Sequence, residues 1–95
     1  MYLRDLSEIL ADDLKDPEYV ALFLEHSLED GPETFLSALK EVAKANGGMS
    51  TVARTASLGR ESLYRALSAN GNPEFKTVQS VLNALGMRFS VTRAA

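Results

Sequence analysis

The chain has no cysteine and a single histidine, His26, among its 95 residues. Without cysteine it can form neither a disulfide nor a cysteine-based zinc cluster. His26 lies in an acidic segment and has no second histidine or cysteine with which to share a metal ion. We therefore expect no metal site and no cofactor, and the absence of cysteine fits a reducing compartment such as the cytoplasm.

Groups suited to catalysis are also scarce. A nucleophile–base pair could come only from Ser or Thr with Lys or His26, and nothing in the sequence gathers such groups. The neighbouring carboxylates Asp12-Asp13 and Glu29-Asp30 would point apart on a helix. Gly47-Gly48 follows no strand and precedes no Lys-Ser or Lys-Thr, so it does not form a phosphate loop. We expect no catalytic residue, no enzyme activity and no small-molecule substrate.

Long apolar runs are missing as well. The longest stretch without a charged residue covers eleven residues, Thr77 to Met87, which is far shorter than a membrane span. The first ten residues carry Asp5 and Glu8, where a signal peptide would be basic and then apolar. The sequence therefore predicts neither export nor membrane insertion.

The size of the chain allows one modest hydrophobic core. With 95 residues and 45% hydrophobic content, we expect a single domain over residues 1–95. Within it we expect an N-terminal helical extension (1–31), a helical core (32–86) and a terminal strand (87–92).

Charge is divided unevenly along the sequence. Residues 1–45 contain 11 acidic and 4 basic side chains, whereas residues 46–95 contain 2 acidic and 6 basic ones. A basic half suits contact with nucleic acid phosphates. An acidic half would repel DNA and could attract a basic protein, although acidic helices can also be simple solvated surfaces.

Apolar spacing and helix-end signals predict five helical segments and a possible short N-terminal helix. The N-terminal segment runs from Asp5 to Leu14. The second segment begins at Pro17, after an Asp16 cap, and ends at Asp30-Gly31, and the third begins at Pro32 and ends at Asn46-Gly47-Gly48. The fourth follows a Ser50 cap and ends at Ala56. The last two run from Arg60 to Leu67 and from Phe75 to Gly86.

The helix after Pro17 has more apolar residues than one buried stripe requires. These residues are Tyr19, Val20, Leu22, Phe23, Leu24 and Leu28. We expect one side of this helix to be buried in the core and another side to be covered by something else, such as a partner.

Residues Ser50 to Leu67 predict two short helices joined by a tight turn at Ser57-Leu58-Gly59. In this arrangement Leu58 is an apolar plug, and the small Ala53 permits close helix packing. The pattern is typical of a helix-turn-helix, whose second helix, beginning at Arg60, would enter the major groove of DNA.

The last segment alternates apolar and polar residues. Met87, Phe89 and Val91 share one side, a period of two that predicts a β-strand. Such a strand would pair with a second copy, forming a homodimer, or add to another protein's sheet; a frayed tail is the alternative. A symmetric dimer suits a helix-turn-helix protein, because two recognition helices read a palindrome.

Three blocks, RESLYRALS at Arg60–Ser68, GNPEFKTV at Gly71–Val78 and ALGMRFSV at Ala84–Val91, resemble the HigA-like antitoxins, specifically the short addiction module antidote proteins. The resemblance extends from Asp5 to Val91. It implies an all-α, XRE or lambda-repressor-like helix-turn-helix fold with a terminal strand, and a homodimer. It also implies binding to the module's own operator DNA and neutralisation of a RelE/HigB-like toxin that cleaves messenger RNA.

The turn departs from the family pattern. Relatives usually have Gly at the position of Ser57 and a Ser or Thr cap at the position of Gly59. A serine in a left-handed conformation costs about 1 kcal/mol, whereas glycine is an acceptable N-cap. We expect a slightly reshaped turn.

Within this helix-turn-helix we assign two groups of DNA-binding residues by geometry. Bases would be read by Arg60, Glu61, Ser62 and Arg65. Phosphates would be bound by Ser50, Thr51, Arg54, Gly59 and Lys76. Alternatively, Glu61 and Arg65 could form only a surface ion pair four residues apart. For Tyr64 we favour half-buried packing over groove contact.

Two functions fit this sequence best. One is an antitoxin that represses its own operon and binds a toxin through residues 1–45. The other is a stand-alone XRE-type transcriptional regulator whose N-terminal helices merely complete the core. A protein-interaction adaptor without DNA binding is a third alternative.

Overall fold

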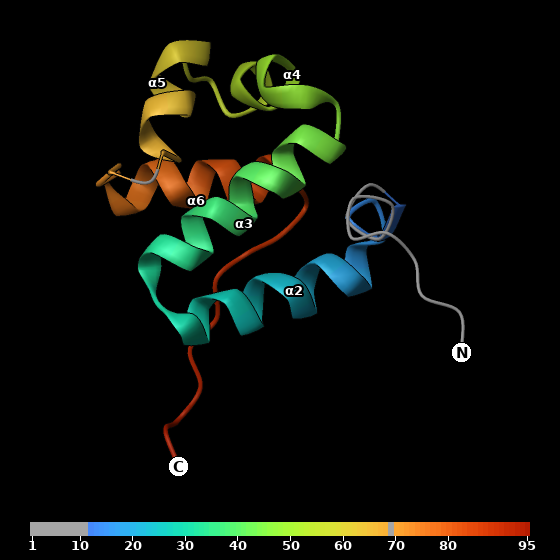
Figure 1. The fold of residues 1–95 in the computed structure, drawn as a ribbon, viewed down its shortest axis with the longest axis vertical. Helices are drawn as coiled ribbons and strands as arrows, with labels where there is room; N and C mark the ends of the chain where they lie inside the picture. The colour runs from blue at the N-terminus through green and yellow to red at the C-terminus, as the bar shows by residue number, and fades with distance from the viewer. Residues whose placement is uncertain (1–11, 69) are drawn as a thin grey trace.

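The computed structural model describes residues 12–68 and 70–95. In this part of the chain the fold is all-helical, with five helices and no strand (Figure 1). The helices are α2 (Pro17–Asp30), α3 (Pro32–Ala45), α4 (Gly48–Thr55), α5 (Arg60–Ala66) and α6 (Phe75–Ala84). Residues 5–11 of the N-terminal segment predicted over 5–14 lie outside the described residues.

Local signals set the ends of α2 and α3 as predicted. The Glu18 N–H donates to Asp16 Oδ1 at 3.0 Å, and Pro17 occupies the first turn, where no N–H is required. Gly31, with φ 125°, separates the two helices, and Pro32 starts α3. A left-handed φ of this kind favours glycine, so the break is set by the sequence itself.

The start of α4 differs from the prediction of a Ser50 cap. The helix begins at Gly48, its N-cap is Gly47 in the left-handed region, and Ser50 lies inside the first turn. Gly47 and Gly48 have φ values of 98° and 85°, so the chain reverses within these two residues and enters the helix earlier. Met49 is consequently a buried helical residue.

Helix α3 forms the centre of the core. Leu39, Val42 and Ala43 on this helix are fully buried. Helix α2 packs on one side of α3 and α4 on another, while α4 also contacts α5 and α6. Figure 1 shows α2 and the α4–α5 pair at opposite ends of the molecule. Burying a large aliphatic side chain contributes about 1.5–3 kcal/mol to the stability of the fold. Because α2 and α4 both pack on α3, this helix positions the α2 end and the α4–α5 end of the molecule.

A polar contact ties the segment before α2 to the end of α3. The Asn46 side-chain amide donates to the carbonyl oxygens of Leu14, at 2.6 Å, and Val42, at 2.8 Å. Leu14 itself is 1% exposed and belongs to the core. Asn46 therefore satisfies a helix-end carbonyl and fixes a segment that is remote in sequence.

The strand predicted over residues 87–92 is not found in the single chain. Strand hydrogen bonds need a second strand, and the described part of the chain contains none. The tail instead leaves α6 through a Met87 N–H bond to the Leu82 carbonyl at 2.8 Å. The Phe89 ring then packs near Phe75 and Phe35, with centroid distances of 5.1 and 6.1 Å.

Candidate nucleic-acid interface

Helices α4 and α5 are joined by a tight turn over residues 56–59, as predicted. The Leu58 N–H donates to the Ala53 carbonyl at 2.8 Å. Leu58 is half-buried and packs against the core, and Ala53 is 2% exposed. The predictions for the apolar plug and for the small residue at the helix contact are therefore confirmed.

The conformations of Ser57 and Gly59 match the expected departure from the family turn. Ser57 has φ 59° and is the one non-glycine residue with a positive φ in the described chain. Gly59 is the N-cap of α5 and makes no side-chain cap hydrogen bond. Serine in this region costs about 1 kcal/mol relative to an unstrained residue, and a glycine cap leaves α5 without an oxygen acceptor.

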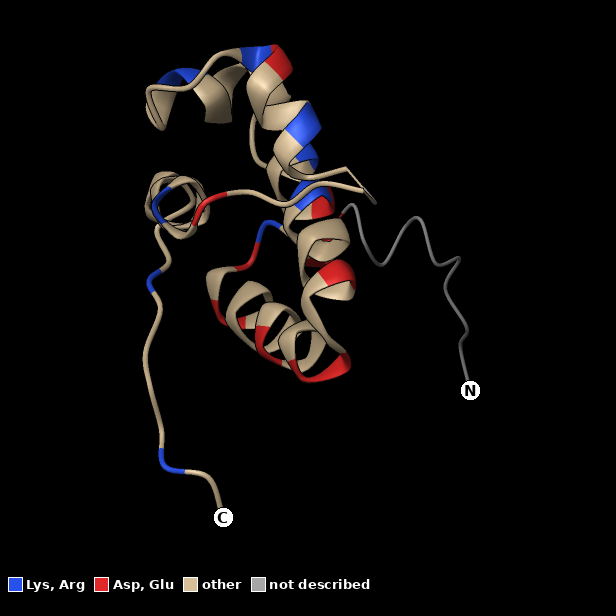
Figure 2. Ribbon diagram, turned by 90° about the vertical axis from the view of Figure 1, so that its left-hand side faces the viewer, with Lys and Arg blue, Asp and Glu red and all other residues tan. Residues whose placement is uncertain are grey.

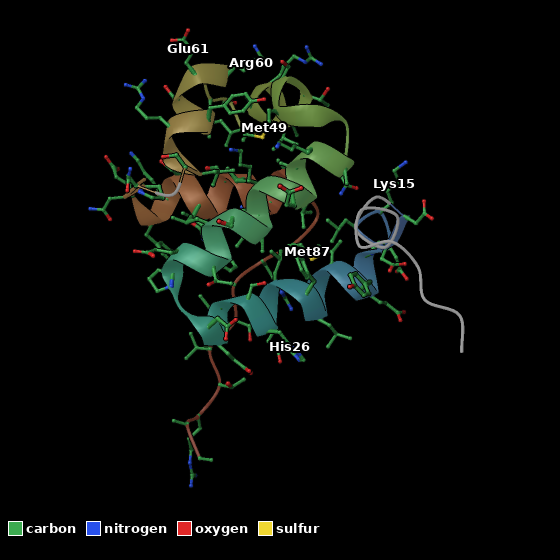
Figure 3. The ribbon with its side chains drawn as sticks, viewed as in Figure 1. Lys15, His26, Met49, Arg60, Glu61 and Met87 are labelled. Carbon is green, nitrogen blue, oxygen red and sulfur yellow. The ribbon has the colours of Figure 1, made fainter. Side chains whose placement is uncertain are left out.

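The four residues predicted to read bases all lie on the exposed side of α5. They are Arg60, Glu61, Ser62 and Arg65. Leu63 and Leu67, exposed by 0% and 2%, hold the opposite side of the helix in the core. Figure 3 shows Arg60 and Glu61 at the end of the molecule, pointing away from its body.

The alternative of a Glu61–Arg65 surface pair is not found. Between these two described side chains, no nitrogen and oxygen atoms come within 4.0 Å. Both side chains therefore remain available to bind a ligand in front of α5.

The residues assigned to phosphate lie on three different elements. Ser50 and Arg54 are exposed on α4, Gly59 is exposed at the start of α5, and Lys76 is exposed on the first turn of α6. Thr51 is half-buried, so its side chain is less accessible than its neighbours. Helix α6 packs against α4 and places Lys76 outside the α4–α5 pair.

The Tyr64 ring lies near two cations, Arg60 on its own helix α5 and Lys40 on α3. The Arg60 guanidinium carbon lies 5.2 Å from the centroid of the Tyr64 ring, and Lys40 Nζ lies 5.7 Å from it. Tyr64 is half-buried, as predicted. Lys40 was missed, because it is 24 residues away in the sequence and no local pattern links it to α5. Its proximity to Arg60 adds a second positive charge at this surface.

Charge is separated in space as it is in sequence. Helix α2 carries four acidic residues and no lysine or arginine, whereas α4 and α5 together carry three arginines and one glutamate. In Figure 2 the blue segments of α4 and α5 lie at one end of the molecule, and the red segments of α2 lie at the other. The α4–α5 end is therefore the one suited to a polyanion.

The residues predicted to make a dimer lie on the tail after α6. Met87 and Phe89 are half-buried against the chain's own core, whereas Val91 is 96% exposed. The structure therefore does not place the three on a common free edge.

The described helices include none long and apolar enough to cross a membrane. In the same residues, no group of three His, Asp or Glu side chains is arranged to hold a metal ion.

Residues 6–93 match the family model described as "Probable addiction module antidote protein". A protein of Haemophilus influenzae, described as an uncharacterized protein, is 44% identical over 86 residues, which cover 90% of this chain and 88% of that protein. No solved structure matches the chain. The family match includes all five described helices.

Proposed function

The chain belongs to the family of probable addiction module antidote proteins, and on this basis we propose that it is the antitoxin of a type II toxin–antitoxin module. In this proposal it acts by binding rather than by catalysis. It neutralises a RelE/HigB-like toxin and binds operator DNA to repress its own operon.

The observation that carries the DNA-binding part is the α4–turn–α5 geometry. The second helix of this unit, α5, is anchored by buried Leu63 and presents four polar residues outward. In an XRE-type helix-turn-helix such a helix lies in the major groove. Arg60 and Arg65 can then donate bidentately to guanine, while Glu61 can accept from cytosine.

Phosphate contacts would fix the position of α5 in the groove. Ser50 lies in the first turn of α4, where backbone N–H groups have no partner within the helix. Exposed Arg54 on α4 and Lys76 on α6 add positive charge. These contacts give affinity and orientation rather than sequence preference.

We also propose that the protein binds its operator as a homodimer. One α5 is seven residues long and offers few base contacts. Two copies related by a twofold axis would double them on a palindromic site.

Two measurements test the proposal. The protein should shift a fragment of its own promoter in a salt-dependent manner, because phosphate binding releases counterions. It should also co-purify with the product of an adjacent gene and restore growth when that product is toxic alone. DNA binding without a toxic neighbour would favour a stand-alone XRE-type regulator, and toxin binding without any promoter shift would leave an antitoxin that does not autoregulate.

A further inference from the structure

Helix α2 leaves large apolar side chains on its outer surface. Leu22 is 59% exposed and Leu28 is 48% exposed, and the small Ala21 directly before Leu22 is exposed too. Val20 and Leu24 on the same helix are buried and already hold α2 on the core. The fold therefore does not require Leu22 and Leu28, so their exposure calls for another explanation.

Carboxylates run alongside these apolar residues. Glu18, Glu25 and Glu29 are exposed on α2, and together with Leu22 they follow a four-three-four spacing along one side of the helix. No nitrogen of a described lysine or arginine lies within 4.0 Å of the Glu25 or Glu29 carboxylate. This side of α2 is therefore both apolar and negatively charged.

A groove of about 520 Å³ adjoins this side of α2. One wall is α2, with Glu25 and Glu29 among its lining residues, and the other wall is the tail after α6. The apolar part of the lining is Ala21, Leu24, Leu28, Phe35, Leu82, Met87 and Phe89. Arg88 also lines it, as a cation on the tail wall. The groove thus extends the apolar surface of Leu28 into the molecule.

We propose that this α2 surface, formed by Ala21, Leu22, Glu25, Leu28 and Glu29 with the adjoining groove, binds an amphipathic helix rich in Lys or Arg. The inference rests on the proposed function, since the partner that bears this helix would be the toxin. Apolar side chains of the helix would contact Leu22 and Leu28 and enter the groove. Its cations would pair with Glu25 and Glu29.

Charge excludes the other common occupants. In a symmetric dimer through this surface, the glutamates of one copy would face those of the other, and like charges at close range are unfavourable. DNA and anionic lipid surfaces would be repelled for the same reason. A basic protein segment is complementary in both charge and polarity.

The position of this surface has a consequence for repression. Figure 3 places His26 of α2 and the pair Arg60 and Glu61 of α5 at opposite ends of the molecule. A toxin bound at α2 would therefore leave α5 uncovered. We infer that toxin and operator DNA bind the same antitoxin chain at the same time.

The test uses the full-length protein and the purified product of the adjacent gene. Neutralising the acidic side with the double variant Glu25→Gln/Glu29→Gln should weaken toxin binding about tenfold at low salt, and the difference should shrink as salt rises. Leu28→Ala should weaken it about fivefold or more, as expected of a central interface contact. Glu41→Gln/Glu74→Gln, which removes two solvent-accessible carboxylates on α3 and before α6, is the charge-matched control and should leave toxin affinity unchanged.

The outcomes separate the surface from the function. If the wild-type protein binds the toxin but the α2 variants bind as tightly as the control, the surface is wrong and the antitoxin function stands. If the wild-type protein does not bind the toxin at all, the proposed function itself fails. A slower-migrating complex containing operator DNA, antitoxin and toxin would support simultaneous binding, and release of DNA by toxin would overturn it. Because Glu25, Leu28 and Glu29 are exposed, thermal unfolding should be nearly unchanged in each variant.

Discussion

The guanidinium group of Arg60 lies over the Tyr64 ring, with 5.2 Å between the guanidinium carbon and the ring centroid. The two residues are four apart on α5, so the helix itself sets their spacing. Arg60 is exposed, whereas Tyr64 is half-buried and packs against the core. We therefore expect Tyr64 to position Arg60 for the proposed base contact.

Replacing the Tyr64 ring should weaken operator binding. Tyr64→Leu keeps an apolar side chain but removes the contact with Arg60 and Lys40, worth about 0.5–1 kcal/mol at an exposed site, so affinity should fall two- to fivefold, an order-of-magnitude figure. Tyr64→Phe retains the ring and should bind nearly as the wild type does. Titration of labelled operator DNA measures both. Equal loss in the two variants would point to the hydroxyl group instead.

Arg60 and Arg54 should differ in what they contribute. Arg60→Ala should cost about 1–3 kcal/mol on the operator and relax the preference for one base pair. Arg54→Ala should weaken binding to operator and unrelated DNA alike and reduce the salt dependence by about one ion. Competition titrations with both DNAs at several salt concentrations distinguish these effects. If each variant loses operator binding and unrelated-DNA binding in the same proportion, the division of roles between Arg60 and Arg54 is wrong.

The α4–α5 turn should gain stability from restoring the family pattern. Ser57→Gly removes about 1 kcal/mol of left-handed strain and should raise the free energy of unfolding by up to about 0.5 kcal/mol after the greater freedom of the unfolded glycine is counted. Gly59→Ser adds a side-chain oxygen at the N-cap of α5 and should raise the free energy of unfolding by roughly a few tenths of a kcal/mol. An added Cβ at Gly59 would meet Ser62 Oγ at 3.6 Å, an ordinary contact. Urea unfolding measures both effects, with Gly59→Ala as the control that lacks the oxygen.

Gly71 should not tolerate a side chain. A Cβ there would lie 2.7 Å from the Arg65 carbonyl oxygen and would also clash with the carbonyl oxygen of Ala66. Backbone atoms cannot move aside easily, so Gly71→Ala should destabilise the protein by about 2 kcal/mol or more. Gly59→Ala, where the added Cβ would make only an ordinary contact with Ser62, should cost far less. Thermal unfolding compares them, and equal melting temperatures would contradict the predicted clash.

Loss of the Asn46 amide should release the segment before α2. Asn46→Ala leaves the Leu14 and Val42 carbonyls without this donor and should cost about 1–3 kcal/mol. Asn46→Asp keeps the size but replaces the donor by an acceptor, so it should be at least as harmful. Hydrogen exchange at α2 and α3 amides would follow the loosening. Unchanged protection in both variants would show that the contact contributes little.

The sequence by itself determined most helix ends and the α4–α5 turn. Asp16, Pro17 and Pro32 act within one helical turn of their own position, and Leu58 and Leu63 reveal their burial through spacing alone. The unusual conformation of Ser57 was also predictable, because it depends on a local exchange with Gly59. These features need no knowledge of what packs against them.

Tertiary structure decided what depends on residues far apart in the chain. It brought Lys40 to the Tyr64 ring, which no sequence pattern links to it. It also placed the ring of Phe89, a predicted strand residue, next to the rings of Phe35 and Phe75. A period of two sets which side a residue faces, but strand hydrogen bonds require a partner, and the described chain offers aromatic rings instead. The side of a residue is thus a local property, whereas its contact partner is set by how the helices pack.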